Sequence, residues 1–134
     1  MDNKKKVFIL EENNIMSKAT NTIVITGRLG QDMEFKDFGN DNGVATGRVA
    51  FSDKYKKNDE WVEDTHWFTV KHFGRNAQSF SQRYHKGDMV SFVGSLKSNE
   101  YMSEGNKRTE IYVQVDNAQL MKRSGETVSD NNPF

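Results

Sequence analysis

The sequence predicts an all-β protein: a small five-stranded barrel with one short helix between the third and fourth strands and two long hairpin arms. Three observations lead to this prediction. Apolar and polar residues alternate over several short segments, which is the pattern of half-buried strands. Clusters of Gly, Asn and Asp separate these segments and favour tight turns. A single segment has apolar residues at intervals of three and four, the spacing of an amphipathic helix.

The first two strands are separated by a turn rich in glycine and asparagine. The first strand begins near Asn21, and Gly27 in its middle indicates a bend or a bulge. A short extended piece through Phe35 and a Gly-Asn-Asp-Asn-Gly turn follow. The second strand covers residues 44–52. Residues 53–64, charged and with a tyrosine among lysines, are predicted to form a long hairpin that we call the first arm.

The third strand, residues 65–73, has aromatic residues on both faces. Because side chains alternate along a strand, Phe68 can face the core while Trp67 and Phe73 lie on the opposite face with Lys71 between them. Such a face suits a single strand of nucleic acid, since each ring can stack on a base and the ammonium group can approach a phosphate. A second packing surface, against a helix or another subunit, is the alternative interpretation.

The rest of the chain contains the helix, two strands and a second arm. The spacing predicts a helix over residues 75–85, with Gly87 at its C-cap. The fourth strand, near residues 89–96, and the fifth, over residues 109–120, are joined by the second arm, residues 97–108.

This order of elements predicts the fold and the bounds of the folded domain. One helix between the third and fourth strands of a five-stranded antiparallel set fits the OB fold, whose second and third strands and adjoining loops bind oligonucleotides. We expect one OB-fold domain over residues 21–123. Residues 1–20 are expected to be a flexible extension in which Met16 offers a second start, and residues 124–134 a flexible tail.

Composition narrows the classes of function. The 19 Lys and Arg residues balance 19 Asp and Glu residues, so net charge alone does not indicate a nucleic-acid partner. The chain has no cysteine, and no apolar run approaches the length of a membrane span, so we expect a cytoplasmic protein without a membrane partner.

We expect neither an enzyme nor a bound cofactor or metal. His66 and His72 lie six residues apart on one strand, about 20 Å, too far to hold one metal ion without a bend. The sequence has no glycine-rich phosphate loop and no nucleophile motif.

Three segments of the chain resemble the bacterial and phage single-stranded DNA-binding protein family, a resemblance that covers residues 21–123. The segment NTIVITGRLGQDMEF is similar to the family's first strand, with Met33 where proline is usual. DTHWFTVKHFGRNAQ is similar to its most specific motif, a tryptophan on the third strand followed six residues later by Phe-Gly and the helix. YHKGDMVSFVGSL is similar to its Lys-Gly turn and following strand.

The resemblance implies a set of DNA-binding residues. The base-stacking aromatics correspond to Tyr55, Trp67, Phe73 and Tyr101, and the two tyrosines stand where tryptophan is common. Phosphate-binding residues on the matching strands and arms are Arg28, Lys54, Lys56, Lys71, Lys97, Lys107 and Arg108. We assign Trp61 to arm structure.

The resemblance also implies a role and an assembly. The family binds and protects single-stranded DNA in replication, recombination and repair, and does so as a homotetramer. An RNA-binding or protein-interaction OB module stays open as the alternative, because stacking and phosphate contacts do not depend on the sugar.

The end of the tail resembles the family's acidic tip that finishes in Pro-Phe. It has one aspartate where several are usual, and the long linker rich in Gly and Pro is absent. By this resemblance Asp130, Pro133 and Phe134 bind replication and repair proteins, with Phe134 entering an apolar pocket. An ordinary frayed terminus is the alternative interpretation.

Overall fold

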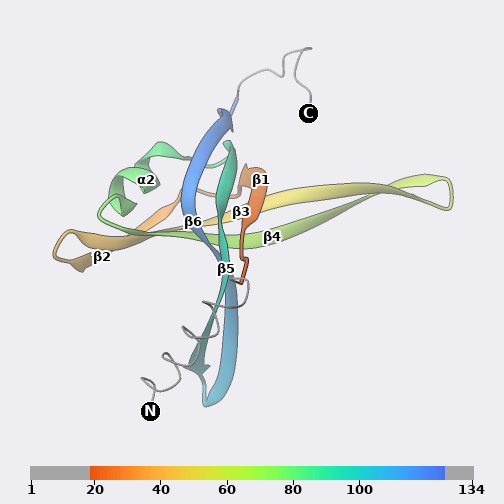
Figure 1. Cartoon of the computed structure of the whole chain (residues 1–134). Coiled ribbons are helices and arrows are strands. Elements are labelled where there is room, and N and C mark those ends of the chain that lie inside the picture. The colour runs from red at the N-terminus through yellow and green to blue at the C-terminus, as the bar shows by residue number, and fades with distance from the viewer. Residues whose placement is uncertain (1–18, 126–134) are drawn as a thin grey trace.

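Six strands and one helix make up residues 19–125, the part of the chain that the computed structural model describes (Figure 1). In chain order they are β1 (Ile23–Leu29), β2 (Glu34–Gly39), β3 (Asn42–Lys57), β4 (Glu60–Gly74), α2 (Ala77–Arg83), β5 (Met89–Ser103) and β6 (Asn106–Lys122). The five predicted strands correspond to all of these except β2. The short extended piece predicted through Phe35 continues to Gly39 and pairs with β3 as this extra strand.

The barrel closes through a pairing between β1 and β3. The strands follow the order β1-β5-β6-β4-β3-β2, and the added β1–β3 contact closes the first five, while β2 lies on the free part of the β3 edge. The predicted barrel with one helix between its third and fourth strands is thus confirmed. The expectation of an antiparallel set is wrong at one place, because β4 and β6 run parallel around the Val70–Val113 pair. The chain passes through α2 and β5 before β6 returns in the direction of β4.

Gly27 is needed where the barrel closes. β1 pairs with β5 in continuous register through Gly27, so the bend or bulge predicted there is absent from this pairing. A Cβ atom at this position would collide with the backbone carbonyl of Ala50 on β3. Glycine therefore permits a close approach of two backbones, and register shifts occur elsewhere, between β5 and β6 and near Asp37 in the β2–β3 pairing.

The core fills the barrel and extends to the helix. Phe80 and Tyr84 pack from α2 and the residue after it against buried apolar side chains that include Leu29, Val49, Val70, Val90, Phe92 and Val113. The helix is shorter than predicted and ends at Arg83, with an extended C-cap at Tyr84. The prediction of Gly87 as C-cap is wrong: this residue has a φ of 87° in the turn before β5, where the left-handed region favours glycine.

Two hairpins continue beyond the barrel as the predicted arms (Figure 1). The first arm reverses at Asn58-Asp59 and the second at Glu104-Gly105, and all four residues have positive φ. The β2–β3 turn has the same conformation at Asn40-Asp41. Positive φ at both central residues is typical of two-residue turns whose twist matches that of the flanking strands, which explains how long two-stranded arms stay regular.

The expectations about a membrane span, a metal site and the two ends of the chain can be compared with the described residues only in part. Between residues 19 and 125, no helix is long and apolar enough to cross a membrane. In the same range no cluster of three or more His, Cys, Asp or Glu side chains is placed to hold a metal ion. Residues 1–18 and 126–134 lie outside the described residues, so the predictions for Met16, Asp130, Pro133 and Phe134 stay predictions.

Candidate nucleic-acid interface

The β4 strand separates its side chains into a core face and an exposed face. Val70 is fully buried, and Phe68 packs against the core with its ring 5.7 Å from that of Phe51. Trp67 and Phe73 are 47% and 42% exposed. The predicted division of β4 is therefore confirmed. We call the exposed face of β4, together with the residues that lie beside it on the neighbouring strands, the outer face.

Trp67 lies in an open depression beside an arginine. A Cβ atom on Gly30 would come within 2.6 Å of the Trp67 ring, so glycine is needed for the indole to rest against this loop. The Arg48 guanidinium lies 5.8 Å from the indole centroid and donates a hydrogen bond of 3.2 Å to Thr69 Oγ1. Gln31 completes the lining of the depression, about 320 Å³. A base stacked on Trp67 would have a positive charge beside it.

Arg28 continues the outer face across the barrel. Ala50 pairs with Trp67 on β4 and with Arg28 on β1, so these three residues form a row across three strands. Neighbouring strands are about 4.8 Å apart, which places Arg28 roughly 10 Å from the tryptophan strand. The Arg28 guanidinium donates a 2.9 Å hydrogen bond to the carbonyl of Gly87, which holds it near the turn before β5.

Lys71 lies between the two rings of β4, and its charge is paired. Its Nζ is 2.6 Å from Oε1 of Glu110 and 4.6 Å from the centroid of the Tyr112 ring. The Tyr112 ring is in turn 6.4 Å from that of Phe73. Lys71 therefore joins β4 to the second arm, and a phosphate that approaches this ammonium group must compete with the Glu110 carboxylate.

A groove of about 500 Å³ lies beside Phe73. Its lining includes Lys36 and Phe38 of β2 as well as Tyr112, and the Lys36 Nζ is 5.9 Å from the Phe38 centroid. Val44 pairs with both Lys36 and Phe73, which places the lysine on the outer face. Sequence reasoning missed these two residues and also Arg48. If the Asn and Asp residues after Gly39 had been interpreted as a hairpin turn, the extended piece before them would have been predicted to pair with β3. Lys36 and Phe38 would then have been found as part of this surface.

The second arm contributes three of the predicted residues to this surface. Lys97 pairs with Tyr112, and Tyr101 pairs with Arg108, so all four lie on one face of the arm. Lys107 does not join them. It belongs to the next cross-strand pair, on the opposite face, where its Nζ is 3.1 Å from the carboxylate of Glu100.

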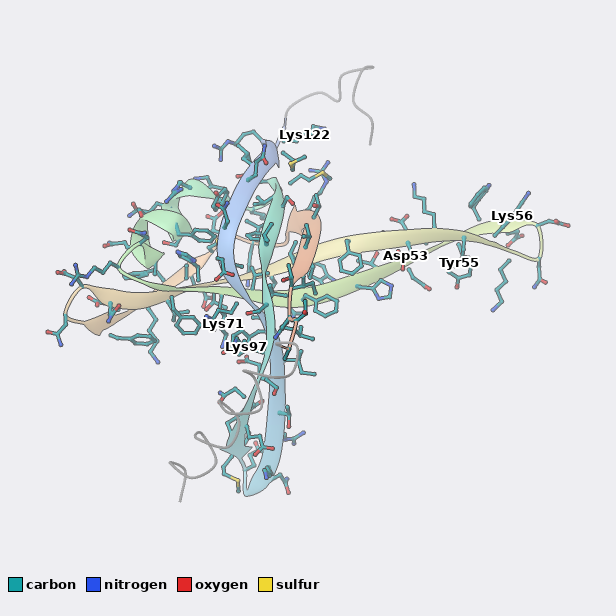
Figure 2. All side chains as sticks on the ribbon, viewed as in Figure 1. Asp53, Tyr55, Lys56, Lys71, Lys97 and Lys122 are labelled. Carbon is teal, nitrogen blue, oxygen red and sulfur yellow. The ribbon has the colours of Figure 1, made fainter. Side chains whose placement is uncertain are left out.

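The first arm divides the predicted residues in the same way. Lys54 and Lys56 alternate on β3 with Tyr55, so the lysines share the face of Arg48 while the tyrosine lies on the other. The carboxylate of Asp64 raises the pKa of Tyr55, chiefly through its charge, with smaller contributions from desolvation and a hydrogen bond. Figure 2 shows Tyr55 and Lys56 far out along this arm, away from Lys71. The structure does not bring Tyr55 together with the rings of the outer face.

The chain matches a known protein family. The model of the single-strand binding protein family matches residues 20–121. The single-stranded DNA-binding protein of Treponema pallidum is 31% identical over 101 residues, which are 75% of this chain and 57% of that protein. The protein of the same name from Borreliella burgdorferi is 31% identical over 110 residues, 81% of this chain and 74% of that protein. The chain thus spans little more than half the length of the Treponema relative.

Solved structures share the fold. A small single-stranded DNA-binding protein from Streptomyces coelicolor superposes with a TM-score of 0.60 at 24% identity, covering 76% of this chain and 95% of that one. The Plasmodium falciparum SSB in complex with ssDNA gives a TM-score of 0.68 at 22% identity, covering 80% and 97%. The family model covers most of the barrel and both arms, and the two relatives are 31% identical to the chain over more than 100 residues each. The chain therefore belongs to the single-strand binding protein family.

Proposed function

We propose that this chain binds single-stranded DNA, with little sequence preference and without catalysing a reaction, and that it protects such DNA during replication, recombination and repair. The observation that carries the proposal is the outer face. There Trp67, Phe73 and Tyr101 are exposed among basic side chains from all six strands. The relatives named above support the choice of DNA as the ligand.

The arrangement explains why little sequence preference is expected. An exposed ring can stack on any base, because every base has a π-face, and each stacked base contributes about 1–3 kcal/mol. Basic groups such as Arg28 and Lys97 meet phosphates, which carry no sequence information. The open form of the depression at Trp67 and the groove at Phe73 leaves room for purines and pyrimidines alike.

A fluorescence titration tests the proposal. Stacking on Trp67 should quench tryptophan emission when oligo(dT) is added, and the affinity should fall as salt is raised, because bound phosphates release counterions. Equal quenching by duplex DNA, or none by either ligand, would contradict the proposal. Tighter binding of an oligo(rU) of the same length would instead favour an RNA-binding module.

We also propose a homotetramer. Val24 and Val93 are exposed cross-strand neighbours on β1 and β5. Leu96, Met102 and Ile111 are exposed on the face of the second arm opposite Tyr101. Two separate apolar surfaces suit a tetramer with two kinds of two-fold interface. Sedimentation equilibrium should give the mass of four chains, and a monomer mass at micromolar concentration would contradict this.

A further inference from the structure

We propose that the tip of the first arm is a second base-stacking site, formed by Trp61 and Lys56, so that bound DNA extends from the barrel along this arm. The inference deepens the proposed function and rests on it. It also revises the assignment of Trp61 to arm structure, which the sequence alone had favoured.

The exposure of Trp61 does not fit a packing role. Its side chain is 72% exposed, more than any other large apolar residue between residues 19 and 125. A ring that stabilised the hairpin would bury much of its surface, since the gain from burial is proportional to the apolar area removed from water. The Lys56 Nζ lies 6.0 Å from the Trp61 centroid, so the ring stands next to a positive charge while its surface stays open to solvent.

The register of the arm places Trp61 on the same face as Trp67. Lys56 pairs with Trp61, Lys54 with Glu63, and Ala50 with Trp67, and the pairing has no register shift between these positions. Trp61 and Trp67 are an even number of residues apart on β4, so their side chains lie on the same face of the strand. They are six residues apart, about 20 Å at roughly 3.3 Å per residue. This distance corresponds to about six stacked nucleotides at about 3.4 Å each, or fewer if the strand is extended.

Charge distinguishes the two faces of the arm. The face with Trp61 has Lys54 and Lys56 against a single acidic residue, Glu63. The face with Tyr55 has Asp53, Glu60 and Asp64, with Lys57 as its one lysine. On that face Asp53 also pairs with His66 at 3.2 Å. A phosphate backbone is attracted to the face with Trp61 and repelled by the face with Tyr55. Only the Trp61 face therefore combines an exposed ring with a net positive charge to which DNA can bind.

The position of the arm supports a polynucleotide rather than a second copy of the chain as the partner. The arm extends away from the barrel, and its tip is formed by polar residues around the one exposed indole (Figure 1). A stable protein interface needs a larger contiguous apolar core than this, whereas a single base needs only one ring face and a nearby cation.

The two tryptophans allow each site to be observed separately. In Trp67→Phe the only tryptophan is Trp61, and in Trp61→Phe the only tryptophan is Trp67. Both changes keep a ring that can stack. Each protein is titrated to saturation with a long oligo(dT), with the matching duplex, and with an oligo(dT) of about three nucleotides. This short strand is about half of the stacked span and therefore cannot reach both rings even when it is extended.

We expect the long oligo(dT) to quench both single-tryptophan proteins and the duplex to quench neither. Trp61→Ala should weaken binding of the long oligonucleotide about fivefold or more, the equivalent of one stacked base, and leave the short one almost unchanged. Val62→Ala, at the same tip but on the opposite face, is the matched control and should have little effect on either ligand.

Three results would overturn the inference. Quenching of Trp67 without quenching of Trp61 would contradict the arm site while leaving the proposed function intact. Quenching of neither residue would contradict both. A Trp61 emission that depends on protein concentration in the absence of DNA, and does not respond to oligo(dT), would show that the tip binds another copy of the chain instead.

Discussion

Lys71 and Glu110, 39 residues apart in the chain, form an ion pair of 2.6 Å where β4 meets the second arm. The pair is only partly exposed, 20% for the lysine side chain and 35% for the glutamate. It aligns the lysine over the Tyr112 ring and so holds two rings of the outer face in place. It also places a carboxylate in the middle of a surface that we expect to bind phosphates.

Replacing Glu110 should therefore strengthen DNA binding. Glu110→Gln keeps a hydrogen-bond acceptor for Lys71 and removes the negative charge. We expect tighter binding of oligo(dT) at low salt, and a log–log salt dependence steeper by about 0.7 if one more phosphate is contacted. Glu100→Gln is the control, because Glu100 pairs with Lys107 on the opposite face of the arm. The same gain in both variants would show that net charge, and not position, is responsible.

The two faces of β4 should respond differently to truncation. Trp67→Ala and Phe73→Ala should each weaken oligo(dT) binding by about 1–3 kcal/mol. They should leave the protein folded and lower the free energy of unfolding less than Phe68→Ala does, because both rings are about half exposed and lie outside the core. Phe68→Ala should lower the free energy of unfolding by about 3 kcal/mol, the low end for phenylalanine because its side chain is only partly buried. Urea unfolding and fluorescence anisotropy separate the two effects. Unfolding of Trp67→Ala with a stable, non-binding Phe68→Ala would invert the assignment.

Arg48 should contribute to binding although sequence reasoning did not select it. Arg48→Ala removes the guanidinium beside Trp67 and its hydrogen bond to Thr69, and we expect a loss of roughly 0.5–2 kcal/mol in binding together with a weaker salt dependence. Arg83→Ala, on α2, is the control with the same change in charge. An equal loss in both variants would mean that Arg48 acts only through the net charge of the protein.

Asp88 should make stability depend on pH. Its side chain is fully buried, and burial by itself would raise its pKa. Hydrogen bonds from the amides of His85 and Ser124 and from Arg123 outweigh this, so that the pKa of Asp88 is lowered on folding. A lowered folded pKa means that this stabilisation is complete above the unfolded pKa, about 3.9, and is lost as the pH falls through the folded value.

The variant Asp88→Asn tests this link between the turn before β5 and the end of β6. At pH 7 it should lower the free energy of unfolding by about 1.5–3 kcal/mol, the worth of hydrogen bonds to a charged group. The difference from the parent protein should shrink as the pH is lowered below about 4. Urea unfolding at several pH values measures it, with the exposed Asp116→Asn as control. A difference that stays constant with pH would contradict the prediction.

The tail lies outside the described residues, and its predicted role can be tested directly. Deleting Pro133 and Phe134 should abolish binding of replication or repair proteins, because these two residues are the large apolar features of the tail. Affinity for oligo(dT) should stay the same or rise slightly. Pull-downs with the full chain and the deleted chain, together with a DNA titration of each, measure both effects. Unchanged partner binding would favour an ordinary terminus without this role.

Much of the barrel followed from local features of the sequence. The alternation of apolar residues placed Val70 and Phe68 toward the core and Trp67 and Phe73 away from it, since period-two alternation is a property of the strand itself. The Asn and Asp residues at the turns also act locally, because they tolerate the positive φ that a two-residue hairpin requires.

Other features depend on register and closure, which involve segments distant in sequence. Tyr55 and Lys107 were grouped with the DNA-binding residues, yet cross-strand pairing places each on the opposite face of its arm. A shift of one residue in register exchanges the faces of a strand, so the face is decided by where the turn falls.

The sequence by itself determined the fold class, the two arms and the two faces of β4, because each depends on spacing within one segment. Only the tertiary structure decided which charges are paired and which rings have a cation beside them. Glu110 reaches Lys71, and Arg48 reaches the Trp67 ring, because barrel closure and strand register bring their strands together. Which side chains become neighbours across strands is decided by the register of the pairing, and the periodicity within a single strand does not specify that register.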